Sequence, residues 1–198
     1  MKFNYFFLCS LLFMWVSCDS NKKHLSKISA KTIQIDSAII ADSDITKVIR
    51  PYKVKLSLEM DKILCYTPVD FVKYDGILQS SLGNLMADLS YEIANPIFKK
   101  LTNSNIDFVF FNYGGIRAII PKGDVTTEVA YKLMPFDNQL VVTTLSGEKI
   151  IELVNYFIKS KRAHPLSKQV NLTIKEDEYF LKINEKPFEK SRTYTVLT

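Results

Sequence analysis

The stretch Asp107-Phe-Val-Phe-Phe-Asn-Tyr-Gly-Gly-Ile-Arg117 joins a short apolar run to a pair of glycines and an arginine. An apolar run bounded by turn-forming residues is typical of a strand buried on both faces. The clearest helical pattern precedes it, over residues 81–94, where Ser80 or Ser81 is placed to cap the helix and Pro96 to end it. The helical spacing assigns to its inner face Leu82, Leu85, Met86, Leu89 and Ile93.

Helices and strands are predicted to alternate on both sides of this stretch. A short helix is expected from Thr126 or Thr127 to about Leu133, and Ser146 is placed to cap a second helix. The inner face of that second helix is assigned to Ile150, Ile151, Val154 and Phe157. Strands are predicted at residues 31–40, 63–69, 139–145, 170–175, 179–183 and 192–197. A helix that starts or kinks near Pro51 is predicted within residues 42–62, and the whole pattern predicts an α/β fold with covered sheets.

Composition places the chain among globular proteins with one domain. Its 198 residues are 47% hydrophobic and 24% charged, which suffices for one core. The net charge of +5 is spread along the chain among acidic residues, which favours a solvated mixed surface over a nucleic-acid-binding patch. We therefore expect no nucleic-acid partner.

The N-terminal residues predict export. A short basic start is followed by an apolar run, residues 5–16, that has the length of a signal-peptide core and is too short to span a bilayer. The run ends at Ser17-Cys18, which resembles the lipobox of bacterial lipoproteins, although Trp15 departs from its usual leucine. The prediction is a signal peptide at 1–17, lipidation of Cys18, a polar tether at 18–30 and a folded part at 31–198. An uncleaved anchor or an ordinary signal peptide is the alternative. Either way, the folded part leaves the cytoplasm.

No independent catalytic centre is predicted. The two histidines, His24 and His164, have no second histidine or clustered carboxylate at metal-ligand spacing, so no metal site is expected in this chain. No nucleophile elbow, phosphate-binding loop or dinucleotide-binding glycine motif occurs. Cys65, the remaining thiol of the mature chain, is expected to be a buried small hydrophobe.

Two segments suit ligand binding. In the first, Gly114 and Gly115 allow close backbone approach and Arg117 offers a planar fork for phosphate oxygens; a tight turn with a surface arginine is the alternative. In the second, Phe136 could stack on a nucleobase and Asn138 could bond its edge; a phenylalanine tucked into the core is the alternative.

Four motifs together resemble the C-terminal domain of 5′-nucleotidases. They are Ser81-Leu-Gly-Asn-Leu-Met-Ala-Asp88, Asn112-Tyr-Gly-Gly-Ile-Arg117, Pro121-Lys-Gly-Asp124, and Leu133-Met-Pro-Phe-Asp-Asn138 with Leu145-Ser-Gly147. The resemblance covers roughly residues 40–198 and keeps the order and spacing of the family.

The resemblance implies a layered αββα domain that clamps a nucleobase between two aromatic rings. Phe136 matches the first ring, Asn112 and Asn138 match positions that bond the nucleoside, and Arg117 matches an arginine that holds phosphate oxygens. The metals and the hydrolysis belong to a separate N-terminal domain in the family, so a divalent-metal phosphoesterase is expected as a partner and no cofactor is expected in this chain.

The sequence also departs from the family pattern. Residues 76–79, Gly-Ile-Leu-Gln, replace an arginine and a glutamate, and Asp137 replaces a glycine. The second ring of the clamp would follow a strand like 193–197, which suggests a domain truncated at its C-terminal end.

Three hypotheses follow from this pattern. The chain is the nucleotide-binding half of a split 5′-nucleotidase, a stand-alone nucleoside- or nucleotide-binding lipoprotein, or a structural surface lipoprotein with a decayed pocket.

Overall fold

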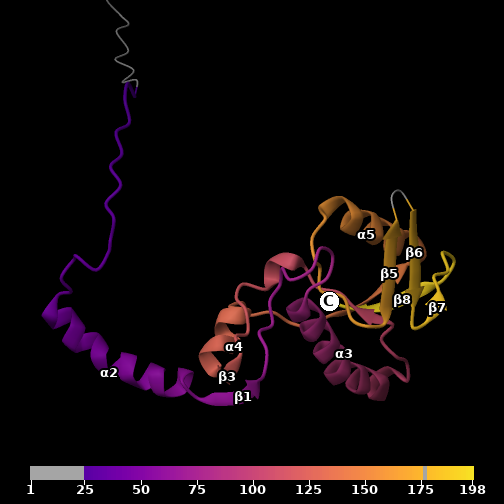
Figure 1. Ribbon diagram of the computed structural model, residues 1–198, viewed down its shortest axis with the longest axis horizontal. Coiled ribbons are helices and arrows are strands. Elements are labelled where there is room, and N and C mark those ends of the chain that lie inside the picture. The colour runs from indigo at the N-terminus through magenta and orange to yellow at the C-terminus, as the bar shows by residue number, and fades with distance from the viewer. Residues whose placement is uncertain (1–24, 176–177) are drawn as a thin grey trace, which may run out of the picture. The chain divides into compact units, whose positions relative to one another are not determined.

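The structure is a computed structural model that describes residues 25–175 and 178–198 (Figure 1). The predicted signal peptide, Cys18 and the beginning of the tether therefore lie outside the described residues. The chain divides into two compact units, Met1–Thr46 and Lys47–Thr198. Its elements in order are α2 (Ser43–Met60), β1 (Ile63–Thr67), α3 (Ser81–Thr102), β2 (Phe108–Val109), the 3-10 turn η1 (Tyr113–Gly115), β3 (Gly123–Thr126), α4 (Thr127–Leu133), β4 (Val142–Ser146), α5 (Gly147–Ser160), β5 (Val170–Lys175), β6 (Glu178–Ile183), β7 (Lys186–Pro187) and β8 (Thr193–Leu197).

The described part of the first unit contains no strand, so the strand predicted at residues 31–40 is wrong. Its residues are exposed and pair with no other segment that the structure describes. The alternating pattern is interrupted by a turn in which the Asp36 side chain accepts a hydrogen bond from the Ala38 N–H (2.9 Å). An isolated strand without a partner leaves its backbone groups to water, and alternation alone does not stabilise it.

A three-stranded sheet in the order β2-β8-β4 forms the centre of the second unit. Strand β8 runs parallel to β2 and antiparallel to β4, so the sheet is mixed. A second sheet, β5-β6-β7, is antiparallel, and β1 pairs with β3 in a separate two-stranded sheet. The predicted α/β fold is confirmed.

Alternate residues of the central sheet pack into two different cores, as the period of a strand requires. On one face, Phe108, Tyr194 and Val196 pack with Ile150 and Val154 of α5 and with residues of β6. On the other face, Val109 and Leu197 pack against Ala87 of α3. Helix α3 and the pair formed by α5 and the second sheet thus cover opposite faces of the central sheet.

Helix α3 continues past Pro96, and its buried face differs from the predicted one. Leu82 and Ala87 are buried, but Leu89 and Ile93 of the predicted inner face are 44% and 65% exposed. The helix persists to Thr102 because Phe98, beyond the proline, packs against the core around Ile106. Tertiary packing here outweighs the hydrogen bond that proline removes.

The caps of the two shorter helices agree with the sequence prediction. Thr126 accepts a hydrogen bond from the Val129 N–H at the start of α4, and Ser146 accepts one from the Lys149 N–H at the start of α5. Gly147 follows the second cap, where a Cβ would overlap the carbonyl oxygen of Lys190. Glycine is required there by this close backbone approach.

The sheet of β1 and β3 is largely open to solvent. Every residue of β1 except Thr67 is exposed, including Cys65, so the prediction that this thiol is buried is wrong. The short apolar run that suggested burial belongs to an exposed two-stranded sheet. Within residues 25–175 and 178–198, the structure has no helix of sufficient length and apolar character to traverse a bilayer.

Candidate functional site

The turn Asn112–Arg117 follows strand β2, is closed by one internal backbone hydrogen bond and is bonded to the end of α4 by another. The Gly115 N–H donates to the Asn112 carbonyl (3.2 Å), and the Arg117 N–H donates to the Leu133 carbonyl at the end of α4 (2.8 Å). A Cβ on Gly115 would lie 2.8 Å from the Asn112 Oδ1 and 3.6 Å from the Met134 Cε. The turn therefore packs closely against the beginning of the 134–138 loop, with the Asn112 side chain next to Gly115.

Arg117 and Phe136 meet across this contact. The guanidinium carbon of Arg117 lies 5.1 Å from the centroid of the Phe136 ring, within the range of a cation–π interaction. Phe136 is 47% exposed, so its ring is not tucked into the core. The structure thus places a cation and an accessible aromatic ring side by side, which is what binding a phosphate and a base would need.

Phe136 lines a cavity of about 680 Å³ together with the end of α4. Its other lining residues are Glu128, Tyr131, Lys132, Met134, Pro135 and Asp137. Tyr131 is 63% exposed and gives the cavity a second aromatic side chain. Sequence reasoning missed Tyr131, although its exposure could have been inferred from its place on α4 opposite the buried Leu133 face.

The structure does not place the other predicted binding residues in the cavity beside Phe136. Asn112, Gly114 and Asn138 are exposed, and Asn138 does not line the cavity beside Phe136. Asp137 does line it, so a negative charge lies next to the ring. The roles of these residues in binding stay predictions.

Tyr113 belongs to the turn, and two further cationic side chains lie against its ring. The Lys73 Nζ lies 4.4 Å from its centroid and donates to the Ile116 carbonyl (2.6 Å), and the Arg162 Cζ lies 5.6 Å from the same ring. These positions come from segments far from the turn in sequence, so no local motif pointed to them. Together with Arg117, they make the surroundings of the turn positively charged.

His164 is a buried residue that contacts the backbone of the turn. It is 5% exposed, and its Nδ1 accepts a hydrogen bond from the Tyr113 N–H (3.2 Å). Its Nε2 lies 3.2 Å from the Ser160 Oγ, which itself donates to the Phe157 carbonyl (3.2 Å). Burial lowers the pKa of His164 below its ordinary value, and the charge of Arg162 acts in the same direction, against an opposing hydrogen bond with the Phe111 backbone. The imidazole is therefore a neutral support for the turn at pH 7.

Residues 68–198 match the family described as 5′-nucleotidase, C-terminal domain. The chain belongs to this family. The match includes the Asn112–Arg117 turn, Phe136, helices α3 and α5, and the sheets β2-β8-β4 and β5-β6-β7.

Relatives of the 5′-nucleotidase C-terminal domain are found in much longer proteins. Endonuclease YhcR of Bacillus subtilis is 27% identical over 142 residues, which covers 71% of this chain and 11% of that protein. A 5′-nucleotidase of Vibrio vulnificus is 26% identical over 140 residues, covering 68% of this chain and 24% of that protein. The chain thus spans 11% and 24% of the lengths of these two relatives.

The fold is shared with a solved structure of the same kind. A 5′-nucleotidase precursor from Thermus thermophilus superposes with a TM-score of 0.57 at 21% identity, over 77% of this chain and 32% of that chain. At this identity the similarity establishes the fold, which agrees with the family match.

Proposed function

We propose that this chain binds a nucleotide through Phe136 and Arg117, for hydrolysis by a metallophosphoesterase carried on a separate polypeptide. The observation that carries the proposal is the pairing of an accessible ring with a guanidinium 5.1 Å from its centroid. The ring offers a stacking surface for a base, and the guanidinium offers paired donors to a phosphate. Divalent metals would reside on the partner.

The positive charge around Tyr113 supports an anionic ligand. Lys73 and Arg162 lie against this ring, and the sequence lacks the family's arginine within residues 76–79. We infer that these two cations compensate for that arginine in attracting a phosphate. Residues 1–18 further support export and lipid anchoring through Cys18, on the periplasmic or cell-surface side of a bacterial membrane. Anchoring both polypeptides to one membrane would raise their effective concentration.

A thermal-shift measurement on the full chain tests binding. AMP should raise the unfolding temperature by mass action, and Phe136→Ala should abolish the shift. Phe180→Ala is a matched control, because Phe180 is also exposed (59%) and has Lys175 Nζ 6.0 Å from its ring centroid. Arg117→Gln should weaken AMP more than adenosine. An equal loss of the AMP shift in both phenylalanine variants would contradict the proposed site.

An activity assay tests the proposal that hydrolysis is carried out by a separate polypeptide. The purified chain with added divalent metal should release no phosphate from AMP, whereas addition of an exported metallophosphoesterase from the same organism should give turnover that Phe136→Ala reduces. Turnover by the chain alone would overturn this part.

A stand-alone nucleotide-binding lipoprotein is the second candidate. It is favoured by the fact that Arg117, Phe136 and Tyr131 are all supplied by this one chain. AMP binding without any effect on a partner's turnover would support it, and no AMP shift at all would support a structural lipoprotein with a decayed pocket.

A further inference from the structure

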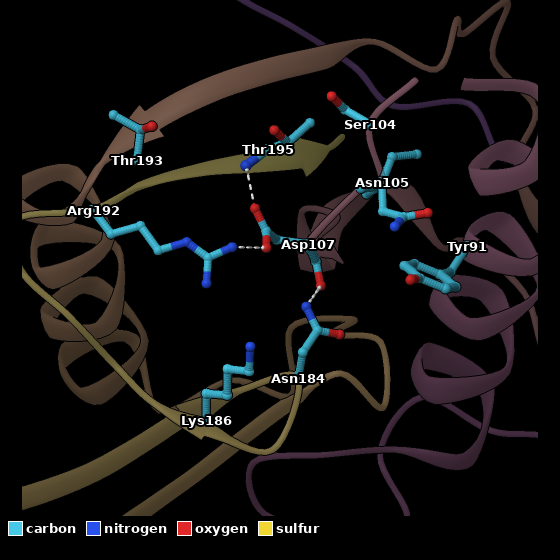
Figure 2. Close-up of a pocket in the computed structure, with 10 residues that line it drawn as sticks. Tyr91, Ser104, Asn105, Asp107, Asn184, Lys186, Arg192, Thr193 and Thr195 are labelled. Atoms are coloured by element: carbon cyan, nitrogen blue, oxygen red, sulfur yellow. Dashed lines mark hydrogen bonds and ion pairs between the residues drawn. The ribbon is translucent and has the colours of Figure 1, made fainter. Parts of the chain in front are cut away.

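A second cavity, of about 590 Å³, is lined by Asp107 and nine other residues (Figure 2). It lies at the end of strand β2 opposite to the Asn112–Arg117 turn. Asp107 precedes the strand and lines this cavity, whereas Asn112 follows the strand. Residues in a strand advance about 3.3 Å each, so the two positions are about 16 Å apart along the chain. None of the residues assigned to nucleotide binding lines this second cavity.

Asp107 is held in the cavity wall by three hydrogen bonds that its oxygen atoms accept. Its Oδ1 accepts a hydrogen bond from the Arg192 guanidinium (2.6 Å), and its Oδ2 accepts one from the Thr195 N–H (2.8 Å). Its carbonyl oxygen accepts a third from the Asn184 side chain (3.0 Å). The carboxylate is thus occupied by protein donors, and its side chain is only 12% exposed.

Arg192 is held by this ion pair but keeps donors for a ligand. Its guanidinium carbon lies 4.9 Å from the Tyr194 ring centroid, and its side chain is 40% exposed. A guanidinium has five N–H donors, and the bond to Asp107 uses Nη2, one of the two terminal nitrogens. Figure 2 shows the other terminal nitrogen of Arg192 directed into the cavity.

Lys186 is directed into the same space from the other side (Figure 2). It follows a two-residue turn, Asn184-Glu185, in which both residues have positive φ (52° and 62°), as a type I′ hairpin requires. Asn184 fixes this turn through its side-chain bond to Asp107 and through its N–H, which donates to the Gln169 carbonyl (2.8 Å). The lysine is therefore presented by a preorganised hairpin.

The charges and donors of the cavity suit a small anion. Among its described lining residues, Lys186 and Arg192 are cationic and only Asp107 is acidic, which leaves one net positive charge. Apart from the apolar Ile106, the rest of the wall consists of neutral side chains with hydrogen-bonding groups, namely Tyr91, Ser104, Asn105, Asn184, Thr193 and Thr195. Burial, and next the charge of Asp107, raise the pKa of Tyr91, so its hydroxyl stays protonated and can donate.

We propose that this cavity binds the phosphate group of a small phosphorylated compound between Lys186 and Arg192. The cavity is larger than a phosphate ion, and its hydroxyl and amide groups suit the hydroxyls of an attached sugar. The site is separate from the proposed nucleotide site. Tyr91 is the one aromatic residue among its described lining residues.

Amide chemical shifts of the full ¹⁵N-labelled chain test this proposal. Inorganic phosphate and ribose 5-phosphate are titrated separately at constant ionic strength, since exposed cations are screened by salt. Saturable shifts are expected at the amides of Asn184, Lys186, Thr193 and Thr195. Tighter binding of ribose 5-phosphate is expected, because the attached sugar adds contacts to the cavity wall. Equal binding of the two would overturn the assignment of an ester and leave the free ion as the ligand.

Lys186→Gln should weaken this binding about tenfold, an amount typical for loss of one charge-assisted contact. Lys182→Gln is the matched control, because Lys182 is an exposed lysine on the neighbouring strand β6 and does not line the cavity. Equal affinities in the two variants would overturn the proposal. So would shifts confined to Gly114, Gly115 and Arg117, which would place phosphate at the nucleotide site instead.

Discussion

The two ends of strand β2 carry polar groups arranged in opposite ways. At one end, Asp107 bonds to Arg192 and to the Thr195 backbone, and its side chain is almost covered. At the other end, Asn112 and Arg117 are exposed, and the turn between them is held through its backbone. Polar side chains satisfied within the fold contribute to stability, whereas exposed ones are free to bind. Substitutions at the two ends should therefore separate stability from nucleotide binding.

The largest effect is expected for Asp107→Ala. It leaves the Arg192 guanidinium and the Thr195 N–H without their acceptor, which should lower the free energy of unfolding by about 2–4 kcal/mol. Urea unfolding followed by circular dichroism measures this change. Asp124→Ala, at an exposed position on β3, should change it by less than about 0.5 kcal/mol. Comparable losses in both variants would remove the special role given to the Asp107 end.

A smaller effect is expected from His164 when the pH is lowered. The folded pKa of His164 lies below its ordinary value of 6.5, chiefly because the ring is buried, so unfolding takes up a proton between the two values. The stabilising effect is complete above pH 6.5 and is lost as the pH falls through the folded pKa. Wild type should therefore lose more unfolding free energy than His164→Gln between pH 7.5 and 5. Parallel pH profiles would show that the ring is not buried as described.

The smallest effect on stability is expected for Gly115→Ala. The new Cβ would meet the Asn112 side-chain oxygen at 2.8 Å, and because Asn112 is exposed it can turn away. The free energy of unfolding should change by less than about 1 kcal/mol, while AMP binding weakens because the Asn112 carboxamide is displaced. Calorimetric titration measures the binding. A large loss of stability with unchanged AMP binding would show that this end of β2 serves stability and not nucleotide binding.

Local patterns predicted the helices whose ends are set by their own residues. Thr126 and Ser146 are caps in the structure as expected, because capping depends on neighbours a few positions away. The buried face of α3 was predicted incorrectly. Leu89 and Ile93 have the spacing of an inner face, but the residue that packs against the central sheet is Ala87. Periodicity reports that a helix has an apolar face and does not report which part of it meets the sheet.

The candidate site was predicted in part. The turn and Phe136 were found because they occur in contiguous motifs, and their proximity follows from the bond between Arg117 and Leu133. The second cavity was missed because the partners of Asp107, which are Asn184, Arg192 and Thr195, follow it by 77 to 88 positions. No spacing rule connects residues so far apart, and each of them alone is an ordinary polar residue.

The position of β8 between β2 and β4 determines when the central sheet can assemble. Its neighbours precede it in the chain, by about 85 residues for β2 and about 50 for β4, and they make no ladder with each other. During synthesis the apolar residues of β2 and β4 must therefore wait, unpaired, until Thr193–Leu197 has left the ribosome. The central sheet therefore cannot close before β8 is available, and until then the apolar residues of β2 and β4 lack the strand that pairs with both.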